Sequence, residues 1–188
     1  MLYLSVGCTS IEHMFVLGID PGLSRCGYGL LLRSNNVTTV IKAGLITTDP
    51  ALPVPDRLAE LRLELRKLLQ EQQLDTVVVE RVFFQTNAKT AMAVGQASGV
   101  ALLTASEFNL EIAEYTSNEV KLAVAGYGGA SKVQVQKMMM TLLGLDSMPS
   151  PPDVADALAL AYCHLASRRI AHATKFHMSR SQSSADVR

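Results

Sequence analysis

The strongest constraint on the fold is a pair of short apolar runs, each of which ends in an acidic residue. Residues 16–19 precede Asp20, and residues 77–79 precede Glu80. Strands that are apolar throughout belong in a sheet covered on both faces, because neither face of such a strand meets water. The two runs therefore predict buried strands at the centre of an α/β domain.

Other segments place further strands and helices around these two runs. Residues 26–32 and 37–47 are predicted to form a hairpin meander with the first strand, and 110–114 is predicted as a fifth strand. Helical spacing or small apolar composition predicts helices over residues 56–73, 87–106, 118–124, 133–143 and 153–169. Three strands followed by alternating helices and strands indicate a mixed β-sheet with α-helices on both faces.

We expect one domain over residues 14–170, with both chain ends outside it. Residues 1–13 lack the basic start and the long apolar run of a signal peptide, and Met14 begins the first strand directly. An upstream start codon would explain this extension. Residues 171–188 are polar and lack apolar periodicity, so we predict a disordered tail.

Cysteine usage and hydropathy exclude several classes of protein. The three cysteines form no CxxC pair and are too few for a disulfide framework, and the four histidines do not have zinc-ligand spacing. No apolar stretch has the length of a membrane span. We therefore expect a reduced, cytoplasmic protein with no membrane association.

The charge distribution is more informative than the net charge of zero, which by itself argues mildly against nucleic-acid binding. Residues 81–106, 121–145 and 157–185 contain basic residues and no acids. If the acidic residues at the strand ends bind cations, the working charge near the site becomes positive. The sequence therefore remains compatible with a polyanionic substrate.

Four acids form the candidate site: Asp20, Glu80, Asp153 and Asp156. If the two apolar strands are parallel neighbours, Asp20 and Glu80 emerge at the same edge, where sites in such sheets lie. Asp153 and Asp156 are three apart and share a helix face, although acids in a first helical turn can also simply favour the helix dipole. Carboxylates in this arrangement are the ligands that Mg²⁺ needs, which predicts a metal-dependent nuclease.

Several other residues have both a structural and a functional interpretation. Gly27 and Gly29 lie on one face of a predicted strand, which indicates the close approach of another backbone or of a ligand. The Phe83-Phe84 pair is either core or an aromatic contact to unpaired bases. A group of lysines is either solvated or in contact with phosphates: Lys89, Lys121, Lys132 and Lys137.

Taken in order, six blocks resemble the RuvC family of Holliday-junction resolvases, in the ribonuclease-H-like superfamily. The resemblance covers about residues 15–171. The blocks are residues 17–29, 78–84 and 95–100, Lys121 with Gly126, and residues 132–136 and 153–159. It implies a ribonuclease-H-like, five-stranded mixed sheet flanked by helices, and a homodimer with two active sites.

The resemblance also implies a function. Asp20, Glu80, Asp153 and Asp156 would be the catalytic acids and would bind two Mg²⁺ ions, for which Mn²⁺ substitutes. The implied reaction is paired nicking of four-way junction DNA in strands of like polarity, which leaves 5′-phosphate and 3′-hydroxyl ends. Phe83 would open or stack at the junction, and Lys121 and Lys132 would contact DNA, with Lys89 as a further contact. The implied partner is the RuvA–RuvB branch-migration complex.

Three alternatives are weaker on the residues present. An actin-like phosphotransferase would need a second phosphate-binding domain, for which 188 residues are too few. A catalytically silent junction-binding protein would lack at least one of the four acids. A nuclease that acts on structured RNA remains a third alternative, against which the matches at Phe83 and the lysines argue.

Overall fold

The computed structural model describes residues 13–71, 73–81 and 88–183. In chain order the elements are β1 (Met14–Asp20), β2 (Arg25–Ser34), β3 (Val37–Thr47), α1 (Val54–Glu71), β4 (Thr76–Glu80), α2 (Ala88–Glu107), β5 (Glu111–Tyr115), α3 (Ser117–Ala125), α4 (Lys132–Leu143) and α5 (Pro152–Ser183). The strands form one sheet in the order β3-β2-β1-β4-β5. β2 is antiparallel to both β1 and β3, whereas β4 is parallel to both β1 and β5. The predicted five-stranded mixed sheet is confirmed.

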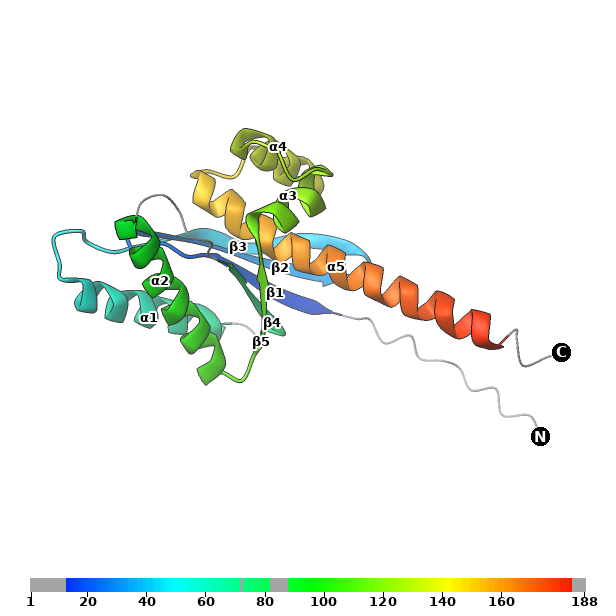
Figure 1. Ribbon diagram of the computed structural model, residues 1–188, viewed down its shortest axis with the longest axis horizontal. Coiled ribbons are helices and arrows are strands. Elements are labelled where there is room, and N and C mark those ends of the chain that lie inside the picture. The colour runs from blue at the N-terminus through cyan, green and yellow to red at the C-terminus, as the bar shows by residue number, and fades with distance from the viewer. Residues whose placement is uncertain (1–12, 72, 82–87, 184–188) are drawn as a thin grey trace.

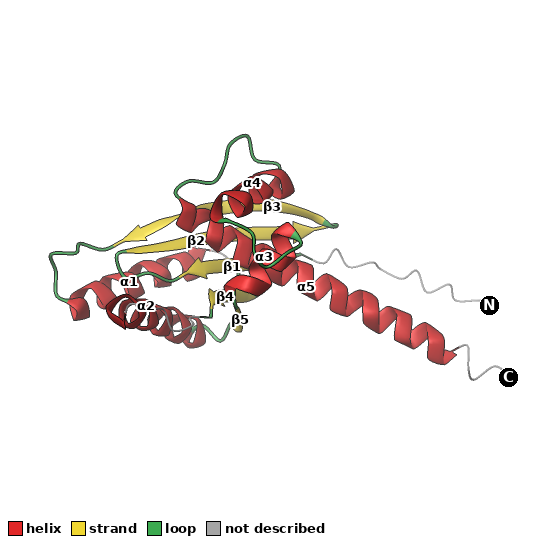
Figure 2. Cartoon of the chain, turned by 45° about the horizontal axis from the view of Figure 1, so that its top comes forward, coloured by secondary structure: helices red, strands yellow, loops and turns green. Residues whose placement is uncertain are grey.

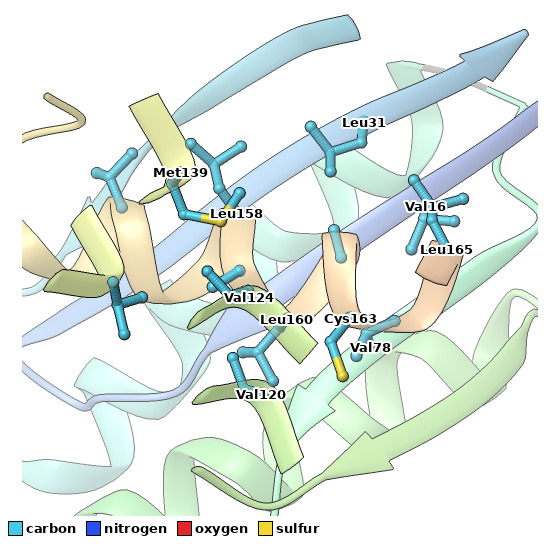
Figure 3. Close-up of a cluster of buried hydrophobic side chains, with 14 of the residues drawn as sticks. Val16, Leu31, Val78, Val120, Val124, Met139, Leu158, Leu160, Cys163 and Leu165 are labelled. Carbon is cyan, nitrogen blue, oxygen red and sulfur yellow. The ribbon is translucent and has the colours of Figure 1, made fainter. Parts of the chain in front are cut away.

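Helices cover both faces of this sheet (Figure 1). Helices α1 and α2 lie on one face, and α5 lies on the other with α3 and α4 packed outside it, as the turned view also shows (Figure 2). The alternation of side chains along a strand divides the central strands between two cores. Val16 and Val78 pack toward α5 (Figure 3), while Leu17 and Val77 pack toward α1 and α2.

Glycines in β1 and β2 allow α5 to rest directly on the sheet. A Cβ atom on Gly18 would lie 2.0 Å from the carbonyl oxygen of Ala157, and one on Gly27 would lie 2.1 Å from that of Asp153. One on Gly29 would lie 2.7 Å from the side chain of Leu158. The predicted close approach of another backbone is thus confirmed at Gly27, whereas Gly29 faces mainly the side chain of Leu158.

The last helix differs from the expectation. The sequence pattern predicts a helix that ends at Arg169 and a disordered tail from residue 171, whereas α5 continues to Ser183 and projects beyond the sheet (Figure 1). Residues 171–183 contain neither glycine nor proline, so nothing in this segment breaks a helix. Among the described residues, no helix is both long and apolar enough to cross a membrane.

Candidate active site

Asp20 and Glu80 end the two parallel strands at the centre of the sheet. The register pairs Ile19 with Val79, so the residue that follows each of them emerges at the same sheet edge. Asp20 lies on the same strand face as Val16 and Gly18, which is the face that α5 covers. A side-chain hydrogen bond joins Asp20 and Glu80. The predicted proximity of these two acids is therefore confirmed.

Asp153 and Asp156 reach the same edge from the first turns of α5. Gly27 makes this possible, because it pairs with Asp20 across β1 and β2 and also lies directly beneath the carbonyl group of Asp153. Any larger residue at position 27 would lift the start of α5 off the sheet. The four predicted acids thus come together from three elements: β1, β4 and α5.

The pKa values of the strand acids report how closely the four carboxylates gather. Burial, and then the charges of Glu80, Asp156 and Asp153, raises the pKa of Asp20 to about 8. Burial, followed by the charge of Asp156, also raises the pKa of Glu80, while its hydrogen bond to Asp20 opposes the shift. Part of each shift arises because the neighbouring carboxylates repel one another, and a bound cation would relieve that repulsion.

Two lysines on helices lie near these acids, and they are the two for which the family resemblance implies DNA contacts. Lys132 Nζ lies 3.2 Å from Asp156 Oδ2, and this neighbouring charge raises the pKa of Lys132. Lys132 follows Ser131, which caps the amino end of α4 through a reciprocal bond with Gln134. Lys121 of α3 lowers the pKa of Glu80, although less than the other charges there. The two lysines therefore supply positive charge at the acidic edge.

Arg25 also reaches the site, although no sequence motif predicts a role for it. Its Nη2 atom donates to Asp153 Oδ2 at 2.7 Å. The signal available in the sequence was its position two residues before Gly27, because alternate residues of a strand share a face. Without the packing of α5 on that face, this spacing did not single out Arg25 from the other surface arginines.

The donor chemistry of the site fits a hard divalent cation, but the described side chains do not form a ready-made metal cage. All four candidate ligands offer carboxylate oxygens, which suit Mg²⁺. In the part of the chain that the structure describes, no three acidic, histidine or cysteine side chains are arranged to hold one ion. Asp153 faces Arg25 and Asp156 faces Lys132 instead. A cation at these carboxylates would therefore compete with Arg25 and Lys132 for the Oδ2 atoms of Asp153 and Asp156.

The other predicted contacts are placed less completely. Phe83 and Phe84 lie outside the described residues, and so does the side chain of Lys89, whose backbone belongs to the first turn of α2. Lys137 is exposed on α4. These residues remain predictions from the sequence and the family resemblance.

Comparison with known proteins identifies the family to which this fold and sequence belong. Residues 16–164 match the family model described as "Crossover junction endodeoxyribonuclease RuvC". The RuvC protein of Alkaliphilus oremlandii is 50% identical over 151 residues, which are 80% of this chain and 92% of that protein. The structure of Thermus thermophilus RuvC superposes with a TM-score of 0.77 at 32% identity, and it covers 84% of this chain and 97% of its own. A structure of T. thermophilus RuvC in complex with a Holliday junction substrate gives a TM-score of 0.75 at 30% identity, with coverage of 84% and 96%. This chain belongs to the RuvC family of crossover junction endodeoxyribonucleases.

Proposed function

We propose that this chain cuts four-way DNA junctions at a two-metal site held by Asp20, Glu80, Asp153 and Asp156. The observation that carries the proposal is the convergence of these four carboxylates at one sheet edge, where burial and the charges of the other three acids raise the pKa of Asp20 to about 8. Family membership makes the chain a DNA junction endonuclease of recombination and repair. The solved complex of the T. thermophilus relative supports a four-way junction as the substrate.

The acids and the lysines of the site have different roles in the proposed hydrolysis. When bound, two Mg²⁺ ions supply Lewis acidity and lower the pKa of a water molecule. Asp20 lies on β1, between Glu80 of β4 and the part of β2 on which Asp153 rests, so it would help to hold the metal together with the acids on both sides. Lys121 and Lys132 place ammonium groups beside the acids, where they stabilise negative charge on the phosphate in the transition state.

The proposed reaction is tested with purified protein, Mg²⁺ and a synthetic four-way junction. We expect paired nicks in strands of like polarity, with 5′-phosphate and 3′-hydroxyl ends that DNA ligase seals. Linear duplex and structured RNA of equal length serve as competing substrates. Faster cleavage of the structured RNA than of the junction would contradict the proposal and favour the ribonuclease alternative.

Lys121→Ala and Lys132→Ala are each expected to slow cleavage by about tenfold or more while weakening junction binding less, because their charge acts at the transition state. Single-turnover rates and binding in EDTA separate the two effects. Lys67→Ala is a matched control, since Lys67 lies on α1 and pairs with Glu64. If the cleavage rate and the affinity for the junction fell by equal factors, the two lysines would be contacts to phosphate that do not act at the transition state.

Phe83→Ala distinguishes a base-stacking residue from a core residue. As a stacking residue, Phe83 can be truncated with little change in melting temperature, but cleavage of an intact junction falls because its centre is no longer opened. A junction built with unpaired bases at its centre should then be cut nearly as fast as by wild type. A core phenylalanine would instead cost about 3–5 kcal/mol of stability on truncation. A large drop in melting temperature, with equal loss on both junctions, would support the core interpretation.

A homodimer through α2 forms part of the proposal, since two sites match the two strands to be nicked. Met92 and Leu103 on this helix are 67% and 56% exposed, and added Cβ atoms on Gly95 and Gly99 meet nothing within 4 Å. Leu103→Glu is therefore expected to shift the protein from dimer to monomer in analytical ultracentrifugation. Leu63→Glu, on the exposed side of α1, is the control. A wild-type protein that sediments as a monomer would refute the dimer.

The proposed cellular setting follows from the family resemblance. We place the chain in the cytoplasm and give it the RuvA–RuvB branch-migration complex as a partner. Co-purification of the chain with RuvA and RuvB on junction DNA tests this partnership. If the amount of this chain retained on junction DNA does not change when RuvA and RuvB are added, the partnership is contradicted.

A further inference from the structure

Arg25 is a charged residue at the site to which the proposed mechanism gives no role. It is the first residue of β2, and its guanidinium donates from Nη2 to Asp153 Oδ2 at 2.7 Å. Gly27, two residues further along the strand, faces the start of α5, so Arg25 shares that face. The positively charged guanidinium of Arg25 therefore lies at the edge of the carboxylate cluster, beside Asp153.

The ion pair between Arg25 and Asp153 contributes little to the stability of the fold. The side chains of Arg25 and Asp153 are 50% and 29% exposed, and ion pairs this close to solvent contribute little to stability. The start of α5 is already held by its close packing on Gly27, and an acid in the first helical turn is favourable without a partner. What the pair does affect is Asp153 Oδ2, an oxygen of a proposed metal ligand.

We propose that Arg25 is a placeholder for the metal at Asp153. It binds this carboxylate in the metal-free protein, is displaced when a divalent cation binds there, and then donates to a phosphate oxygen of the junction. The inference rests on the proposed function, because it requires Asp153 to be a metal ligand.

The chemistry of the guanidinium group suits this exchange. Its planar array of donors matches both carboxylate and phosphate oxygens, so it changes partner by turning the side chain and without refolding of the backbone. The half-exposed position of Arg25 leaves room for this rotation. Before the exchange the guanidinium offsets the negative charge of Asp153, and after it the guanidinium offsets the negative charge of a phosphate.

The first test measures Mn²⁺ binding to DNA-free protein by titration calorimetry. Arg25→Gln removes the competing cation, so we expect Mn²⁺ to bind about two- to fivefold more tightly than to wild type, as the loss of an exposed ion pair predicts. Arg33→Gln is the matched control, because Arg33 lies near the other end of β2 and bonds Leu165 and Asn36. Unchanged affinity in Arg25→Gln, or an equal gain in both variants, would overturn the placeholder role.

The second test measures junction binding with and without metal. In EDTA Arg25 is engaged by Asp153, so Arg25→Gln and wild type should bind the junction alike. With Mg²⁺, the half-saturating junction concentration in single-turnover cleavage should rise for Arg25→Gln. The salt slope of junction binding should then fall by about one, as for one lost phosphate contact. Equal weakening in EDTA and in Mg²⁺ would refute the change of partner.

Asp153→Asn separates failure of this inference from failure of the proposed function. If Asp153→Asn binds Mn²⁺ as tightly as wild type, Asp153 is not a metal ligand. Both the proposed metal site and the proposed role of Arg25 would then be wrong. If Asp153→Asn loses Mn²⁺ binding while Arg25→Gln behaves as wild type, the metal site stands and only the placeholder role is wrong.

Discussion

Replacing Asp20 with asparagine is expected to abolish junction cleavage and, in the same protein, to stabilise the metal-free fold. Removal of residues that only hydrogen-bond a metal ligand costs about 10- to 100-fold in activity, so loss of a residue that would itself hold the metal should exceed about 100-fold. Junction binding should persist, because it rests on phosphate contacts spread over a wide surface. Glu80→Gln, Asp153→Asn and Asp156→Asn should share this pattern of lost cleavage with retained binding.

The gain in stability follows from the raised pKa of Asp20. Because the pKa of Asp20 in the folded protein, about 8, lies above its ordinary value of 3.8, the folded protein holds a proton that the unfolded chain releases between these pH values. The free energy of unfolding therefore falls as pH rises from about 4 to about 8, by an amount on the order of a few kcal/mol. Asparagine carries no ionisable proton at this position, so Asp20→Asn should flatten this pH dependence.

Urea unfolding in EDTA at pH 5.5 and pH 8.5 measures the effect. Wild type should lose more stability between the two pH values than Asp20→Asn does. Asp146→Asn serves as a control, because Asp146 is exposed and lies outside the site. If Asp20→Asn were less stable than wild type at pH 8.5, the carboxylates would not be as crowded as the structure indicates.

Gly27→Ala is expected to slow junction cleavage by about 100-fold, although it replaces none of the acids or lysines of the site. The new Cβ would lie 2.1 Å from the carbonyl oxygen of Asp153 and 2.7 Å from its carbon, and both are backbone atoms that cannot turn aside. Relief requires the start of α5 to lift, which moves Asp153 and Asp156 away from Asp20. Misplacement of catalytic groups by about 1 Å costs on the order of 100-fold, and overpacking costs about 1–3 kcal/mol of stability.

Gly29→Ala is the control for this substitution. Its new Cβ would meet mainly the side chain of Leu158, at 2.7 Å, which can partly give way, together with the backbone nitrogen of Leu158 at 3.0 Å. We therefore expect a smaller loss of both stability and cleavage from Gly29→Ala, with rates measured at a temperature at which both variants are folded. Wild-type activity in Gly27→Ala would show that the position of α5 does not set the geometry of the acids.

Local patterns in the sequence determined the elements and the four acids. The apolar runs that end in Asp20 and Glu80 predict buried strands, because a strand without polar residues has no face for water. The three-residue spacing of Asp153 and Asp156 places them on one helix face. The sequence also contains the reason that α5 continues to Ser183, since residues 171–183 hold no glycine or proline, although their polar composition by itself predicts disorder.

Tertiary packing alone decided how the acids meet and what surrounds them. The parallel pairing of β1 with β4 brings Asp20 beside Glu80, and the close contact of α5 with Gly27 adds Asp153. The bond from Arg25 to Asp153 joins residues 128 positions apart. No local periodicity encodes such a contact, because it depends on where a helix rests on a sheet. That placement is fixed by the space that the glycines of β1 and β2 leave for the helix backbone.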